Sequence, residues 1–255
     1  MEIAFDAIGL EIPNEAAFDN LAESVEKRGE VSQMIRRDGV LHGRCWRIGE
    51  GLEVWTVLFQ TDRGEVFYAD CRPGFRARFS QPINPWVMTE LEAAGEAMIH
   101  GFIEGTEIEI IFELQNITEV SRTIFNLQRL DIGLCGLAYE AEIMPRTAEK
   151  CWNSNHQQEN IWNLCGEILA FRAFRNPVTG SDLYWLHLGL GDFDLEVLVN
   201  QKTLRGDDLH IGAVLRANVW LQGHINSEST KFSRYEGVDY NYRTVDFWKK
   251  LKRLN

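Results

Sequence analysis

Short runs of β-forming residues, separated by turn residues, are the feature that most constrains the fold of this chain. Residues 40–48, 52–60 and 65–70 are such runs, and Gly49-Glu50-Gly51 and Asp62-Arg63-Gly64 lie between them. Glycine and aspartate favour tight turns, and turns this short join neighbouring antiparallel strands. The sequence therefore predicts an antiparallel meander over this part of the chain.

A helix is expected before the meander. Asn14 is a good N-cap residue, and apolar residues recur after it, from Phe18 onward, at the spacing of a helical stripe. This pattern predicts a helix over about 15–28. Residues 3–12 are rich in apolar side chains and predict a strand ahead of that helix. The first 70 residues then have the order β-α-β-β-β.

This order resembles the module of the vicinal-oxygen-chelate (glyoxalase-like) fold. The resemblance is one of topology, and it implies a metal-dependent enzyme whose metal ligands include a histidine on the first strand and a glutamate on the last. Residues 3–12 contain no histidine, and Glu53 is the one tempting carboxylate. We therefore expect no metal site, and we keep a small-molecule or metal-dependent enzyme with such an N-terminal module as the alternative function.

The middle of the chain predicts a second helix and further strands. Thr89 and Glu92 have the spacing of a capping box, so a helix over about 90–99 is expected after an irregular connector that contains Pro82 and Pro85. Three later runs predict strands, at residues 107–115, 121–130 and 134–143.

Eight consecutive polar residues, Asn153–Asn160, are the best linker candidate. They predict two parts, an α+β domain over 1–152 and a β-barrel-like domain with a C-terminal helix over 161–255. Residues 211–223 resemble the closing strands of OB-like barrels, although only four strands are recognisable where such a barrel has five. The predicted fold class is α+β, mostly antiparallel β.

The charge and the cysteine content of the chain limit the classes of function that we expect. The 255 residues carry a formal net charge of −12, whereas phosphate binding needs an excess of Lys and Arg, so nucleic-acid binding is not expected. The sequence has no run of about 18 apolar residues, so we expect no membrane contact and a cytoplasmic location. Five cysteines without a C-x-x-C pair predict free thiols rather than a disulfide framework or a zinc ribbon.

The densest group of cations is a candidate anion site. Arg72, Arg76 and Arg78 lie within seven residues, and guanidinium groups bind phosphate or carboxylate through paired hydrogen bonds. The alternative interpretation is that these arginines pair with the protein's own acidic residues.

An acidic stretch is the second candidate site. Residues 79–121 contain eight glutamates and neither Lys nor Arg, which indicates a solvated face or a docking surface for a basic protein or a cation. If residues 107–114 pair with 121–128, Glu113 faces Arg122, while Glu107 and Glu109 face no cation. Those two glutamates are therefore the expected partner or cation site.

No specific catalytic motif is present. The sequence lacks G-x-S-x-G, phosphate-loop and H-E-x-x-H patterns, and we expect no cofactor. A non-catalytic binding or scaffolding protein, with a basic protein or a small anion as partner, is the favoured expectation. The enzyme named above remains the alternative.

Overall fold

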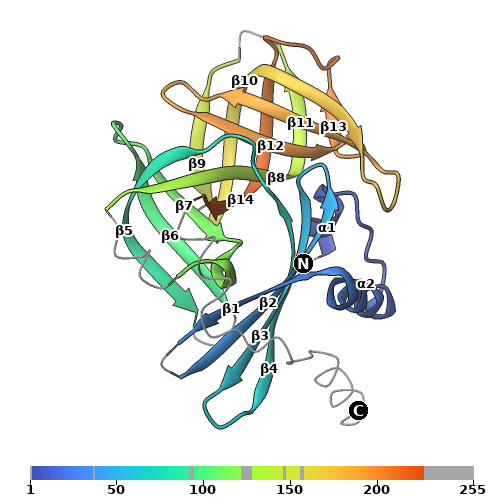
Figure 1. Cartoon of the computed structure of the whole chain (residues 1–255). Helices are drawn as coiled ribbons and strands as arrows, with labels where there is room; N and C mark the ends of the chain where they lie inside the picture. Colours follow the sequence, from blue (N-terminus) through green and yellow to red (C-terminus); the bar gives the residue numbers. More distant parts are fainter. Residues whose placement is uncertain are drawn as a thin grey trace.

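The computed structural model describes residues 2–36, 38–91, 95–121, 128–145, 148–155 and 158–226 (Figure 1). Strands dominate this part of the chain, and most neighbouring strands are antiparallel. They form one four-stranded and one ten-stranded sheet, with two α-helices among the described residues. The expected mostly antiparallel β class is confirmed.

The elements have these bounds: α1 Glu2–Ala7, α2 Glu15–Arg28, β1 Glu30–Ile35, β2 Gly39–Gly49, β3 Leu52–Thr61, β4 Val66–Phe75, β5 Gln81–Leu91, β6 Glu96–Ile103, β7 Glu109–Leu114, the 3-10 turn η1 Ile117–Glu119, β8 Leu130–Met144, β9 Cys151–Asn155, β10 Gln158–Arg175, β11 Asp182–Gly189, β12 Asp194–Asn200, β13 Leu204–Gly206 and β14 Val214–Ile225.

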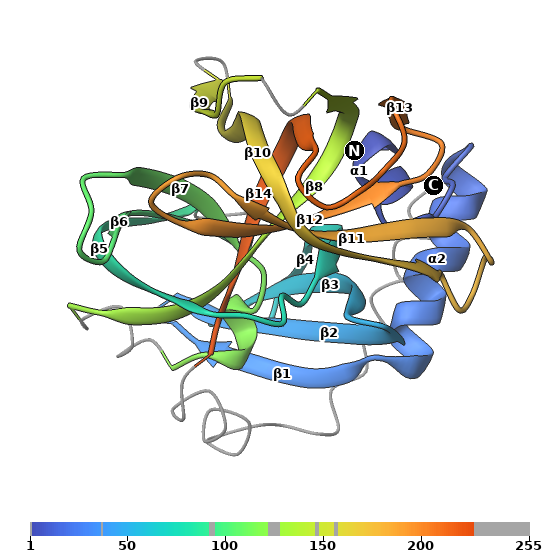
Figure 2. The ribbon, with the colours of Figure 1, turned by 90° about the horizontal axis from the view of Figure 1, so that it is seen from above.

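The N-terminal meander is confirmed. Strands β1 to β4 pair in chain order, and β1 is an additional strand that the sequence did not indicate. Helix α2 begins after Asn14, whose side chain accepts a hydrogen bond of 2.9 Å from the Ala17 amide. Its residues Leu21 and Val25 are buried, and Figure 2 shows the helix beside β2 and β3.

The predicted first strand is wrong, because residues 2–7 form helix α1. Ala4, Phe5 and Ile8 are buried at helical spacing, and the short helix packs against β8, β12 and β4. Gly9 ends it with a φ of 75°, a left-handed conformation that glycine adopts without strain. The order β-α-β-β-β is lost, and with it the topological resemblance to the glyoxalase-like module.

The predicted helix over 90–99 is also wrong. Thr89 lies in strand β5, and β6 begins at Glu96, so the described part of this segment is a hairpin. Ala97 and Ile99 are fully buried with a period of two, and this burial outweighs a local capping signal. The prolines of the expected connector lie in β5, whose pairing with β6 is irregular after Pro85.

The ten-stranded sheet closes on itself twice. Strands β8 and β14 pair along most of their length, and each also pairs with strands on both sides. One ring runs through β8, β5, β6, β7 and β14, and the other through β8, β12, β11, β10 and β14. The two rings therefore share the β8–β14 pair, which Figure 1 shows between them.

The rings are related by an approximate two-fold repeat. In the first ring, Glu113 of β7 pairs in parallel with Gln222 of β14; in the second, Glu196 of β12 pairs in parallel with Cys135 of β8. Cys135 and Gln222 also oppose each other in the β8–β14 pair. Strands β5, β6 and β7, which precede the long strand β8, thus end beside β14. Strands β10, β11 and β12, which precede the long strand β14, end beside β8. Glu113 and Glu196 occupy equivalent positions.

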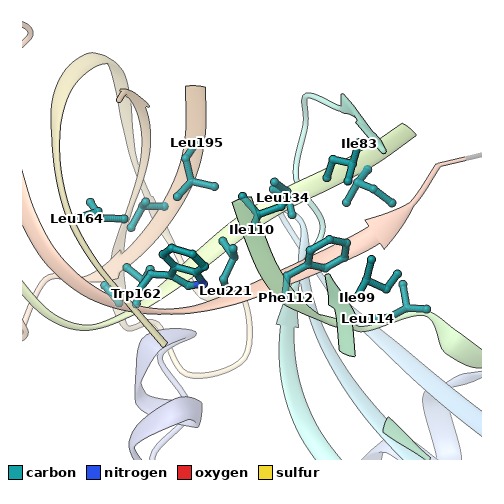
Figure 3. Packing of buried hydrophobic residues seen from close by; sticks show 14 of the residues in the cluster. Ile83, Ile99, Ile110, Phe112, Leu114, Leu134, Trp162, Leu164, Leu195 and Leu221 are labelled. Atoms are coloured by element: carbon teal, nitrogen blue, oxygen red, sulfur yellow. The ribbon is translucent and has the colours of Figure 1, made fainter. Parts of the chain in front are cut away.

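The larger hydrophobic core fills both rings. Figure 3 shows Ile83, Ile99 and Phe112 of the first ring on one side and Leu164 of the second on the other. Leu221 of β14 lies between these groups and is fully buried. A second core joins α1, α2 and the four-stranded sheet to the second ring, through residues such as Phe5, Phe75, Leu137 and Leu198.

The described part of the polar run near 153–160 lies in the paired strands β9 and β10, and its role as a connector between two parts stays a prediction. Asn153–Asn155 lies in β9, and residues 158–160 begin β10. The second ring also takes in β8, which precedes the predicted boundary and supplies the fifth strand that the sequence did not reveal. The separate folding of 1–152 and 161–255 stays a prediction.

Two further predictions fall on undescribed residues. Arg122 and its neighbours up to residue 127, and the expected helix near the C-terminus, lie outside the described part. Within that part, β7 pairs with β6, with Met98 opposite Glu113. No helix among the described residues is long and apolar enough to cross a membrane.

Candidate functional site

A buried arginine between the four-stranded sheet and the first ring organises the candidate site. Arg72 of β4 is 2% exposed, and its NH1 lies 2.8 Å from Asp70 Oδ2 and 3.3 Å from Glu113 Oε1. Its NH2 donates to the backbone oxygens of Leu114 and Gln115 at 3.3 Å each. Asp70 lies two residues before Arg72, so both side chains lie on one face of β4.

The two repeat-equivalent glutamates differ in how well they are satisfied. Glu196 Oε1 accepts hydrogen bonds from the backbone amides of Arg78 and Phe79 at 2.6 and 2.7 Å, and its other oxygen accepts from the Trp185 indole. Glu113 Oε2 accepts a longer bond of 3.4 Å from Asn160, and its buried Oε1 makes no hydrogen bond. Glu113 is thus the member of the pair with unused acceptor capacity.

Glu113 lines a cavity of about 740 Å³, within the range of small-molecule sites. Asp70 and Glu96 line the same cavity, together with Arg72. Asn218 also lines it, and its buried side-chain oxygen has no hydrogen bond. The remaining lining residues are Ala4, Cys71, Pro73, Tyr139, Glu140, Asn160, Ile161 and Trp220. We call this the carboxylate cavity.

Burial changes the protonation of this site. Burial raises the pKa of Glu113 to about 8; the charge of Arg72 opposes this rise, and the charges of Asp70 and Glu96 add to it. Burial, and then the charge of Asp70, also raise the pKa of Glu96. At neutral pH Glu113 therefore holds a proton, and the cavity contains an acid that can be deprotonated by a modest change in its surroundings.

A second ionic network lies nearby around Glu53. Arg76 Nε lies 2.8 Å from Glu53 Oε1, and His224 Nε2 lies 2.9 Å from Glu53 Oε2, which also accepts a bond of 3.0 Å from the Trp55 indole. Burial alone would raise the pKa of Glu53, but His224 and Arg76 lower it to about 2. Glu53 is therefore a fully engaged structural anion.

The three arginines singled out in the sequence do not form one cluster. Arg72 contacts the carboxylates described above, Arg76 bridges Glu53 and Glu119, and Arg78 lies over the Trp185 ring at 4.8 Å. Arg72 and Arg76 thus have internal carboxylate partners, as the alternative interpretation expected. An anion site at these residues stays a prediction.

Glu107 and Glu109 are both exposed. Glu109 begins β7 and lies opposite Phe102, while Glu107 precedes the strand. Glu113, six residues after Glu107, is instead buried in the carboxylate cavity. A partner or cation site at the two exposed glutamates stays a prediction.

Comparisons with known proteins place only the C-terminal part of the chain. A family model described as "Domain of unknown function, E. rectale Gene description (DUF3881)" matches residues 156–223. This is less than half of the chain, and it spans the repeat unit from β10 to most of β14. No curated protein and no solved structure matches the chain.

The sequence concealed the cavity because its members are far apart. Asp70, Glu96 and Glu113 come from three strands in two sheets: β6 and β7 pair with each other, and Asp70 reaches them only because β4 of the four-stranded sheet packs against β7 through Arg72. The spacing of Asp70 and Arg72 on one strand was the sole local signal. Among the described residues, no group of three or more His, Cys, Asp and Glu side chains could hold a metal ion.

Proposed function

We propose that this protein is a non-catalytic binding protein whose carboxylate cavity takes up a small organic cation. One observation carries the proposal: three acidic side chains, Asp70, Glu96 and Glu113, share a cavity with a single arginine, and the buried Glu113 Oε1 makes a 3.3 Å ion pair with Arg72 but no hydrogen bond. A buried acceptor whose hydrogen-bonding capacity is not filled costs free energy, and an ammonium group supplies three donors.

The charges favour a cation over the small anion expected from the sequence. The NH1 and NH2 groups of Arg72 are already engaged by Asp70, Glu113 and two backbone oxygens, which leaves its Nε as the donor without a hydrogen bond. Glu140 adds a fourth carboxyl group to the wall. An alkyl amine would bring its ammonium group to these oxygens and place its methylene chain against Ile161 and Trp220.

Thermal unfolding with added ligands tests the proposal. Putrescine should raise the melting temperature of the full chain, because a ligand that binds only the folded state stabilises it by about 2.7 kcal/mol at about 100 times Kd. The neutral diol of the same length should give no shift, and neither should phosphate. Equal shifts with diamine and diol would contradict the proposal.

Variants locate the effect. Glu96→Gln removes one partly buried carboxylate and should weaken the diamine shift. Asp70→Asn should weaken it as well. Glu65→Gln, which changes an exposed residue in the β3–β4 turn, is the matched control and should respond as the wild type does. Loss of the shift in the control alone would place the ligand elsewhere.

A small-molecule enzyme is the second candidate, and one observation favours it. A glutamate whose pKa is raised to about 8 inside a cavity has the property of a general acid or base. Turnover of an amine that disappears in Glu113→Gln would support this function over simple binding. The metal-dependent version has no support from the described side chains.

The sequence also predicted an OB-like barrel, a cytoplasmic location and a scaffolding role, and these predictions are part of the same proposal. An OB-like second barrel is supported by the closed ring of five strands, and a cytoplasmic location by three free cysteines buried in the protein, Cys45, Cys71 and Cys135. A scaffolding role would require a partner surface, for which Glu107 and Glu109 remain the candidates.

A further inference from the structure

Two cysteines that are fourteen residues apart in the sequence face each other across neighbouring strands. Cys151 of β9 and Cys165 of β10 are directly opposite in the antiparallel pairing of these strands. Directly opposed residues have Cα atoms about 4.5–5.5 Å apart, and disulfides span Cα distances of about 4.4–6.8 Å. The backbone can therefore accommodate a disulfide here without moving.

The strand that carries Cys151 is fixed in this register. The Trp152 ring stacks on the Trp162 ring with centroids 4.2 Å apart and planes inclined by 12°. The Trp152 indole also donates a 3.4 Å hydrogen bond to the Glu109 backbone oxygen. Because the residue beside Cys151 is held in this way, the two thiols stay opposed.

Both thiols are accessible, unlike the other cysteines. Cys151 and Cys165 are half-buried, whereas Cys45, Cys71 and Cys135 are buried. The pair lines a second cavity, of about 620 Å³, which also receives Lys202, Arg205 and Arg216 and the carboxylates of Glu140 and Glu142. Arg216 pairs with Glu142 and Lys202 pairs with Glu11, so Arg205 is the lining cation that would attract a small anionic reagent.

We propose that Cys151 and Cys165 are a thiol–disulfide exchange site whose partner is a small anionic disulfide of the glutathione class. This modification site is separate from the ligand binding proposed above. It converts the free thiols expected from the sequence into a reversible cross-strand link.

Position and protonation set the order of the exchange. Cys151 lies on β9, at the end of the strand order, whereas Cys165 lies between β9 and β14. Burial, and then the hydrogen bond and charge of Cys151, raise the pKa of Cys165 to about 12. Cys151 is therefore the first nucleophile, and once it is capped its effect on Cys165 disappears, while Arg216 still favours the Cys165 thiolate.

The reaction balances as an exchange. The Cys151 thiolate attacks one sulfur of glutathione disulfide and displaces one glutathione thiolate. The Cys165 thiol then loses its proton to solvent, and its thiolate attacks Cys151 Sγ and displaces the second glutathione. Two protein thiols are oxidised to one disulfide, and glutathione disulfide is reduced to two thiols.

The test is alkylation and mass spectrometry of the full-length protein after equilibration in glutathione redox buffers. Trypsin leaves Cys151 and Cys165 on one peptide, residues 151–172, because no Lys or Arg lies between its ends. We expect this peptide to be two hydrogens lighter and resistant to alkylation in oxidising buffer. Reducing buffer should reverse the change. Peptides with Cys45, Cys71 and Cys135 should stay reduced and serve as internal controls.

Variants separate a pair from two independent thiols. Cys165→Ser should stop at a mixed disulfide between Cys151 and glutathione, and Arg216→Ala should slow closure of the wild-type pair. Two outcomes would overturn the proposal: a 151–172 peptide that stays fully reduced in excess glutathione disulfide, or one that carries glutathione on both cysteines without closing. Tight zinc binding by thiols that remain reduced would also overturn it, in favour of a soft-metal site.

Discussion

At the residue scale, Glu113 should make stability depend on pH. Its pKa is about 4.5 in the unfolded chain and about 8 in the folded protein, so between these values the folded state binds the extra proton. Stability from this group is present below pH 4.5 and is lost as the pH rises through 8. We expect the free energy of unfolding to fall from pH 5 to pH 8 and Glu113→Gln to fall less steeply.

Urea unfolding at both pH values measures this difference. Glu65→Gln, with its exposed side chain, should keep the wild-type slope. If Glu113→Gln keeps the wild-type slope too, Glu113 is ionised at neutral pH, and the account of the cavity fails.

Arg76→Ala should destabilise the protein strongly. The substitution removes one of two arginines that contact both Glu119 and Glu53, which is 2% exposed; the other is Arg47. Removing one member of a buried ion pair costs about 3–5 kcal/mol, although the partial exposure of Arg76 and the contacts that Glu53 keeps with Arg47 and His224 place the loss at the lower end. Arg63→Ala, in the exposed β3–β4 turn, should be nearly neutral in the same denaturant titration.

Phosphate should leave the melting temperatures of the wild type and of the Arg76→Ala variant equally unchanged, if Arg76 is purely structural. Protection of the wild type by phosphate would indicate an anion site. Weaker protection of the variant would then restore the anion site that the sequence suggested at Arg72, Arg76 and Arg78. The measurement therefore decides between the two interpretations of that segment.

The structural role of a single residue was predictable from the sequence where its side chain contacts only its near neighbours in the chain. The Asn14 cap was predictable because an N-cap is satisfied within three residues. The protonated state of Glu113 was not, because it depends on Asp70 and Glu96 from other strands. Its alternation with Ile110 and Phe112 predicted the buried face, but Glu113 on the opposite face is buried as well.

At the element scale, strands with local turns were predictable and segments governed by distant packing were not. The hairpin of β11 and β12 and the full length of β14 follow from turn residues and β-forming runs. The predictions for α1 and β6 were wrong because the conformation of these segments depends on the strands that pack against or pair with them. The pattern of residues 2–8 fits a short helix only once β8 and β4 lie against it.

The shared β8–β14 pair gives an element-scale prediction. Gly136 and Gly223 occupy equivalent positions in the two rings, and a Cβ added at Gly223 would lie 2.4 Å from the Phe112 ring, whereas one at Gly136 would lie 3.0 Å from Val219. Gly223→Ala should cost about 1–3 kcal/mol, and more than Gly136→Ala. Chemical denaturation of both variants measures the difference, and the reverse order would contradict the packing described for the first ring.

At the scale of the whole molecule, each ring is completed by the long strand of the other half of the chain: β14 completes the first ring, and β8 completes the second. This arrangement explains why the sequence suggested a boundary near 153–160. A new repeat unit does begin at β10, and the family match at residues 156–223 covers it. The unit is completed by β8, however, so we expect the chain to unfold in one transition. Two separate calorimetric transitions would favour independent domains over 1–152 and 161–255.

The carboxylate cavity depends on the same closure, because β8 and β14, which close the rings, supply part of its wall through Tyr139, Glu140, Asn218 and Trp220. Calorimetric titration of putrescine into the full chain at pH 7, in two zwitterionic buffers of different protonation enthalpy, tests the central claim most directly. A bound ammonium group should lower the pKa of Glu113 and release about one proton per ligand, and Glu113→Gln should release none. Binding without proton release, or the same release from the variant, would contradict a cation site at Glu113.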